Sequence, residues 1–104
     1  MATDHLHSRD FAEWVNTIFQ VHSPGMEAVP LKLTGVVEKN HSETTEQFSL
    51  LFHGPMSPAL PQRIHAVSHE RLGEMNLFVV PHDPENGAMT YEVVFNRIAD
   101  KKSP

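Results

Sequence analysis

The chain has 104 residues, a formal charge of −5 and no cysteine. Its length fits one domain of the common size of ~100–150 residues and leaves no room for a second. The absence of cysteine excludes disulfides, thiolate zinc sites and cysteine nucleophiles. Acidic residues outnumber basic ones by 13 to 8, which argues against a general affinity for nucleic acid or anionic membranes, because both favour basic surfaces.

The sequence has no apolar run of the ~18 residues that a membrane helix needs. Its first residues, which include Asp4, His5 and His7, lack the basic-then-apolar order of a signal peptide. We therefore expect a cytoplasmic protein whose polar residues 1–7 form a flexible tail.

Apolar residues at helical spacing follow this tail: Phe11, Trp14, Val15 and Ile18. They predict a helix with one apolar side. Residues 17–22 are rich in β-branched and aromatic side chains, with Phe19 and Val21 alternating. The helix is therefore expected to be short and to give way to a strand before the turn-forming residues 23–25.

Two strands are predicted next. Apolar and polar side chains alternate in residues 29–37, and Gly35 indicates a bulge. Residues 38–46 are polar and are expected to form a loop. Residues 48–52 place three apolar side chains on one face of a strand. Residues 55–61 contain three prolines and predict an extended connector, because proline is unsuited to helix interiors and ladder strands.

Three further strands are predicted at residues 63–68, 75–80 and 89–95. Residues 81–87, which end in Asn-Gly, predict a hairpin loop longer than the two-residue type. Six short strands separated by turns indicate a mainly β domain over residues 8–98. We expect a small curled antiparallel sheet or barrel of about six strands, with the short N-terminal helix closing one end. Residues 99–104 are expected to form a second flexible tail.

Several segments also match a known pattern. They are FSLLFHGP at residues 48–55, HERLGE at 69–74, LFVVP at 77–81 and YEVVFN at 91–96. As a set they resemble a family of small bacterial domains of unknown function, over about residues 8–97. The resemblance implies no activity. Because members lie beside phage tail-like genes, it implies an accessory or assembly role.

Two histidines depart from the family pattern. His65 stands where the family has an aromatic residue, and His53 stands where it favours arginine. A charged site therefore cannot be carried over from relatives.

Eight histidines are the one compositional excess, and histidine is a common metal ligand. His65 and His69 would converge on one ion if they were helical. On a strand they lie ~13 Å apart, too far for a shared zinc ion with ligands at ~2 Å. A composite ligand or metal cluster of His53, His65, His69 and His82 remains open, because strands bring distant residues together. The alternative is that these histidines lie separately on strand ends and turns.

Other catalytic patterns are missing from the sequence. A nucleophile elbow of the Gly-x-Ser-x-Gly type does not occur, and neither Ser49 nor Ser68 has an activating context. The five glycines form no phosphate-binding loop, and the scattered basic residues form no groove for single-stranded nucleic acid. We therefore predict no catalytic residue and no cofactor.

The most informative segment is the strand at residues 75–80, which is apolar on both faces. Leu51 and Val94 are likewise apolar at positions that should face outward. Cover could come from the helix, the connector or a second copy of the chain, and exposed apolar patches often mark partner surfaces.

We predict an interaction surface centred on Leu51, Phe78 and Val94, with a polar rim of His53, His65 and Glu92. The sequence thus favours a non-catalytic protein-interaction or assembly module, which binds a protein partner or itself but neither nucleic acid nor membrane. The alternative is a small-ligand or metal-dependent enzyme whose barrel mouth is lined by the four clustered histidines.

Overall fold

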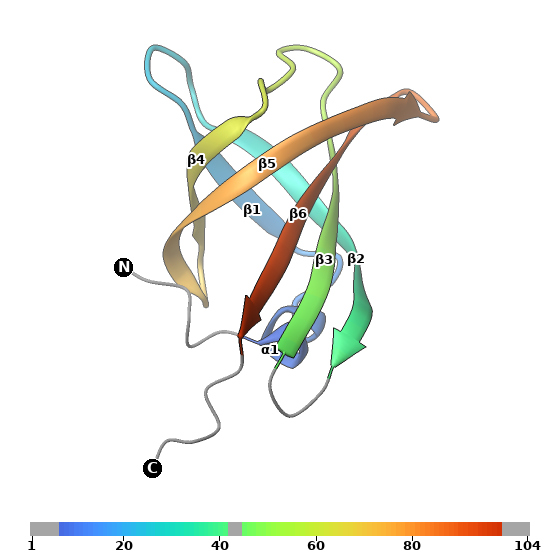
Figure 1. Ribbon diagram of the computed structural model, residues 1–104. Coiled ribbons are helices and arrows are strands. Elements are labelled where there is room, and N and C mark those ends of the chain that lie inside the picture. Colours follow the sequence, from blue (N-terminus) through green and yellow to red (C-terminus); the bar gives the residue numbers. More distant parts are fainter. Residues whose placement is uncertain (1–6, 42–44, 99–104) are drawn as a thin grey trace.

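The computed structural model describes residues 7–41 and 45–98 (Figure 1). Its described part contains one short helix and six strands: α1 (Ser8–Ala12), β1 (Ile18–His22), β2 (Val29–His41), β3 (Thr45–Gly54), β4 (Arg63–His69), β5 (Gly73–Glu85) and β6 (Ala88–Ile98). All neighbouring strands are antiparallel, in the order β1-β2-β3-β6-β5-β4. Pairing of β1 with β4 closes the sheet into a ring, so the predicted fold class is confirmed.

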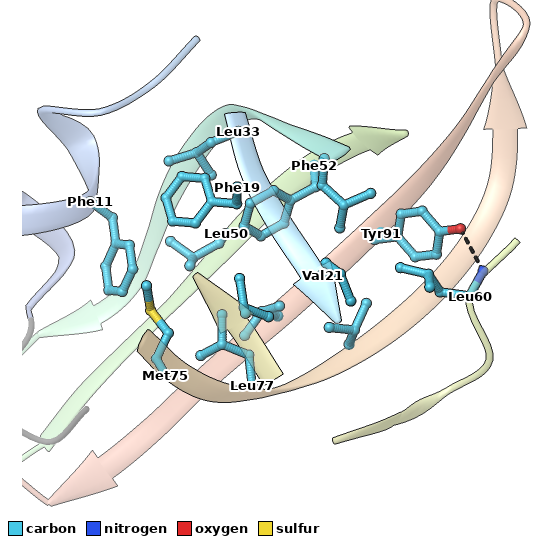
Figure 2. Packing of buried hydrophobic residues seen from close by; sticks show 14 of the residues in the cluster. Phe11, Phe19, Val21, Leu33, Leu50, Phe52, Leu60, Met75, Leu77 and Tyr91 are labelled. Atoms are coloured by element: carbon cyan, nitrogen blue, oxygen red, sulfur yellow. Dashed lines mark hydrogen bonds between the residues drawn. The ribbon is translucent and has the colours of Figure 1, made fainter. Parts of the chain in front are cut away.

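The ring is filled by the inward-facing side chains of all six strands (Figure 2). On β3, for example, Phe48, Leu50 and Phe52 are buried while Leu51 is exposed, as the alternation of a strand with one wet face requires. Phe11 of α1 packs against the stacked rings of Phe48 and Phe95, at centroid distances of 6.1 and 5.5 Å. The helix therefore closes one end of the ring, as the sequence predicted.

The residue before the helix is bonded both to the helix and to the sheet. His7 is the residue before α1, and its Nδ1 lies 3.1 Å from the Glu46 carboxylate. The Asp10 carboxylate in turn accepts a hydrogen bond from the His7 backbone N–H. His7, which was assigned to the tail, thus contacts the first residues of β3. The rest of the two predicted tails, residues 1–6 and 99–104, lies outside the described residues.

The predicted loop at residues 38–46 is largely wrong. β2 continues to His41 and β3 begins at Thr45, and only residues 42–44 between them are outside the described part. Two register shifts explain why the pattern is hard to read: one lies between Leu33 and Gly35, where a bulge was predicted, and one between Glu38 and Asn40. Each shift interrupts the alternation that reveals a strand.

The predicted long loop at residues 81–87 is also wrong. β5 continues through Pro81 and Pro84 to Glu85, and a two-residue turn with positive φ at Asn86 and Gly87 leads into β6. Proline is tolerated here because the pairs of β5 with β4 end at Val79. From there on, one side of β5 has no ladder bond for a proline to break.

The proline-rich connector between β3 and β4 is anchored to the core. Leu60 is buried, and its backbone N–H donates to the Tyr91 hydroxyl at 2.9 Å (Figure 2). The buried hydroxyl of β6 and the buried N–H of the connector therefore satisfy each other.

Candidate interaction surface

Large hydrophobic side chains are exposed on the outer side of the ring. Five of them lie on β2, β3, β6, β5 and β4, and we call this set the apolar face: Val37, Leu51, Val94, Phe78 and Ile64. Their exposed fractions range from 36% for Leu51 to 65% for Ile64. The structure thus places all three residues of the predicted interaction surface at the exterior and adds two.

Strand register brings these side chains together. Ser49 on β3 pairs with Val37 on one side and with Val94 on the other. Leu51, two residues further along β3, pairs with Glu92. Side chains directly opposite each other in antiparallel strands lie about 4.5–5.5 Å apart at Cβ. The face therefore crosses β2, β3 and β6 with Leu51 diagonal to Val37 and to Val94, and with the buried Ser49 between those two valines.

The other two members of the face lie on the next two strands, beyond the point where the β5–β6 ladder ends. Glu92 pairs with Val80 of β5, and Phe78 of β5 pairs with Ile64 of β4. Phe78 and Val94 each lie two residues beyond the Val80–Glu92 pair, on the same outer side of their strands. Ile64 and Phe78 thus form one end of the face and Val37 the other.

Glu92 forms the polar centre of this face. Its carboxylate accepts a hydrogen bond from the Ser49 hydroxyl at 2.6 Å, contacts His82 Nε2 at 2.9 Å and lies 3.4 Å from Lys39 Nζ. The Ser49 hydrogen bond is the main cause that lowers the pKa of Glu92 below its ordinary value of 4.5. Contacts with His82 and Lys39 act in the same direction, and partial burial opposes them. Glu92 is therefore held ionised among apolar neighbours.

This arrangement of serine, histidine and glutamate does not make a nucleophile. In a hydrolase the histidine takes the proton of the serine, whereas here both Ser49 and His82 bind the carboxylate. Ser49 is also buried beneath its neighbours. The cluster fixes the side chains of three strands.

His65 and His69 on β4 point into the ring and are buried. His65 Nε2 donates to the Pro61 carbonyl at 2.9 Å, so the imidazole of His65 holds the connector to β4. His65 was predicted at the rim of the interaction surface. The structure places it in the interior, because His65 shares the inward parity of Val67 and His69 on β4.

His69 is bonded on both ring nitrogens. Its Nδ1 accepts the backbone N–H groups of Arg71 and Leu72 at 3.1 and 3.2 Å, which leaves the proton on Nε2. Nε2 donates to the Thr17 hydroxyl at 2.9 Å. The ring packs on Phe19 at a centroid distance of 4.3 Å. Burial lowers the pKa of His69, against the opposing effect of the Glu70 charge, so the neutral ring joins β1 to the β4–β5 turn.

His53 and His82 lie instead on the outer side of the ring. Both face Thr90 of β6, His53 from β3 and His82 from β5. They line a shallow pocket of about 270 Å³ together with Glu85, whose carboxylate is 3.8 Å from His53 Nε2. His82 is already bonded to Glu92.

The four predicted histidines therefore do not converge, because two are inside the ring and two are outside. In the described ranges no group of three or more His, Asp or Glu side chains is arranged to hold a metal ion. Nor does any helix there have the length and hydrophobicity of a membrane span.

Sequence reasoning missed two residues of the apolar face. Ile64 could have been found, because side chains alternate along a strand and its neighbour His65 points inward with Val67. Val37 could not, because the shift at Gly35 reverses the parity of β2: Leu33 is buried before the shift, and Val37, four residues later, is exposed.

The fold and the surface together define a small β domain with a closed antiparallel sheet, a side-chain-filled interior and an apolar outer face. The chain belongs to a family described as a domain of unknown function, DUF6916, whose family model matches residues 6–95. This match confirms the resemblance seen in the sequence. Comparisons with curated proteins and with solved structures gave no match.

Proposed function

We propose that this domain is a non-catalytic interaction module that binds a protein partner through the apolar face. The observation that carries the proposal is the presence of five large hydrophobic side chains, each more than a third exposed, on the outer side of five successive strands of the ring. Contiguous exposed apolar patches on soluble proteins commonly mark binding surfaces.

Covering the apolar face would gain enough free energy to support binding. Full burial of a Val, Leu, Ile or Phe side chain contributes ~1.5–3 kcal/mol, so covering the exposed half of each contributes about 1 kcal/mol. Five such residues supply several kcal/mol before the costs of association. Phe78 and Ile64, the two that are paired across β4 and β5, offer the largest anchor.

The polar groups at the face favour specificity. His82 and Lys39 are both already bonded to Glu92, so a partner can cover these groups without leaving an isolated charge buried. A polar rim around an apolar centre is the usual anatomy of a protein interface. An assembly role in a phage tail-like system, implied by the family resemblance, is one setting for such a module.

The enzyme alternative has less support. His65 and His69 are bonded within the fold, and His53 and His82 share only a shallow pocket. Among the described residues, the histidines therefore line no common chamber.

The test compares proteins retained by three immobilised forms of the domain from an extract of its source cells. The forms are the wild type, the triple variant Leu51→Ser, Phe78→Ser, Val94→Ser, and the control Ile18→Ser. Ile18 is as exposed as Phe78, at 47%, but lies on β1 across the ring from β6.

We expect a set of proteins that the wild type and the Ile18 variant retain and the triple variant loses. Urea unfolding checks that all three forms are folded. Identical retention by the three forms, or retention by none, would contradict the proposal.

A further inference from the structure

The ladder between β5 and β6 covers only part of the two strands. Its last pair is Val80–Glu92. Before Val80, residues 73–79 of β5 pair only with β4, and after Glu92, residues 93–98 of β6 pair only with β3. In Figure 1 the ribbons of β5 and β6 diverge with distance from the turn that joins them. We call the space between residues 74–78 and 94–98 the seam.

The position of Pro81 in the ladder shows which backbone groups face the seam. Pro81 pairs with Tyr91 but has no N–H, so the hydrogen-bonded pairs of this ladder are its neighbours, Val80–Glu92 and His82–Thr90. Backbone direction alternates along a strand. The N–H and C=O groups of Val94 and Asn96 on β6 therefore point to the seam, as do those of Phe78 and Asn76 on β5.

A side-chain contact supports this assignment. If the backbone N–H and C=O groups of even-numbered β6 residues point to β5, those of odd-numbered residues bond to β3. The backbone groups of Leu51, which pairs with Glu92, must then point toward β2. The Leu51 carbonyl does accept a hydrogen bond from Thr34 of β2 at 3.1 Å. Within the described ranges, the four seam-facing residues have no ladder partner across the seam.

The seam also carries apolar side chains. Phe78 and Val94 are two of the four residues whose backbone groups face the seam. Their side chains project outward beside it, and the residues are 47% and 51% exposed. Unpaired N–H and C=O groups on a strand edge are a template for another strand. A strand added here would meet hydrogen-bonding groups in its own plane and apolar side chains above it.

We propose that the seam binds an extended segment of a partner protein, which adds to the free edge of β5 as an antiparallel strand and places apolar side chains at alternate positions beside Phe78 and Val94. This inference rests on the proposed function and specifies its binding mode. Main-chain bonds to Asn76 and Phe78 would supply affinity, and the flanking side chains would supply selectivity. Antiparallel addition is chosen because it continues the β5–β6 ladder and is the more stable pairing.

Amide hydrogen exchange of the whole chain tests the seam directly. The probe is a capped synthetic peptide with the sequence of residues 91–98, because its first two residues already pair with β5 and it carries apolar side chains at alternate positions. In the free protein we expect fast exchange at Asn76, Phe78, Val94 and Asn96, next to slow exchange at Leu77 and Val93. The peptide should then slow exchange at Asn76 and Phe78.

The control peptide carries backbone N-methyl groups at the positions of Val94 and Asn96, which removes the bonding N–H groups and keeps the side chains. It should give no protection. Slow exchange at the four residues in the free protein, or equal protection by both peptides, or none by either at about millimolar concentration, would overturn the proposal.

Two matched variants separate this proposal from the more general one. Val94→Lys places a charge beside the seam, and Val37→Lys places one at a similarly exposed valine of the apolar face on β2. The seam proposal expects Val94→Lys to weaken peptide binding by about tenfold or more and Val37→Lys to leave it within about twofold. Equal loss of cellular partners from both variants would retain the apolar face as a binding surface and reject the seam.

Discussion

Two opposite walls of the ring, one formed by β3, β6 and β5 (the β6 wall) and one centred on β1 (the β1 wall), can be compared. They have similar inner side chains and different outer ones. Both bury alternate hydrophobic side chains in the common core. On the β1 wall the outer positions are mostly polar, and His22 Nε2 is bonded to the Ser68 hydroxyl at 2.9 Å. On the β6 wall the outer positions carry Leu51, Phe78 and Val94. Since the fold needs only the inner set, we propose that Leu51, Phe78 and Val94 are there for binding.

The largest effect should come from comparing one aromatic residue on each side of the sheet. Phe52→Ala opens a cavity in the core and should lower the free energy of unfolding by ~3–5 kcal/mol. Phe78→Ala removes a half-exposed ring and should lower it by about 0.5 kcal/mol or less. Urea unfolding of both variants measures this difference. A loss at Phe78 as large as that at Phe52 would show that the outer residue serves the fold.

Tyr91 tests how firmly the connector is tied to the β6 wall. Tyr91→Phe removes the acceptor of the buried Leu60 N–H, and an unsatisfied buried donor costs ~1–3 kcal/mol. We expect a loss of unfolding free energy in that range, together with faster amide exchange at Leu60. Unchanged exchange at Leu60 would show that this bond does not hold the connector.

Acid should act on the β1 wall through His69. Its pKa is lowered in the folded protein, so below the ordinary value of 6.5 the unfolded chain binds more protons and the stability falls. One such group contributes a slope of up to ~1.4 kcal/mol per pH unit. His69→Asn keeps an acceptor for the turn and removes the titration, so its unfolding free energy should fall less steeply just below pH 6.5. Parallel pH profiles would exclude His69 as the cause.

A small, pH-dependent effect is expected at the polar centre of the apolar face. Glu92→Gln should lower the free energy of unfolding by about 1 kcal/mol or less at neutral pH, because the cluster is partly solvated. The pKa of Glu92 is lowered, so its contribution is present above its ordinary value of 4.5 and is lost as the pH falls below it. Unfolding curves of wild type and variant should therefore converge in acid. A gap that stays constant would show that ionisation of Glu92 has no part in it.

The sequence contained enough information to predict the inner face. Strict alternation at Phe48, Leu50 and Phe52 identified β3, and the two-sided apolar strand at residues 75–80 led to Phe78 on the exterior. These inferences worked because side-chain parity on a single strand is a local property.

Features that depend on pairing could not be predicted in this way. Ring closure through β1 and β4 joins segments distant in the chain. The bulge after Leu33 reversed the parity of β2 and concealed Val37. The seam depends on where one ladder stops, which local alternation does not reveal.

The central claim is that the outer face of the β6 wall binds a protein and the outer face of the β1 wall does not. The most direct measurement is site-specific photo-crosslinking in the source cells, with a photoreactive amino acid at Val94 in one strain and at Ile18 in the other. Both side chains are about half exposed, at 51% and 47%. We expect a discrete crosslinked product from position 94 and none from position 18. Equal products from both positions, or a product from position 18 alone, would contradict it.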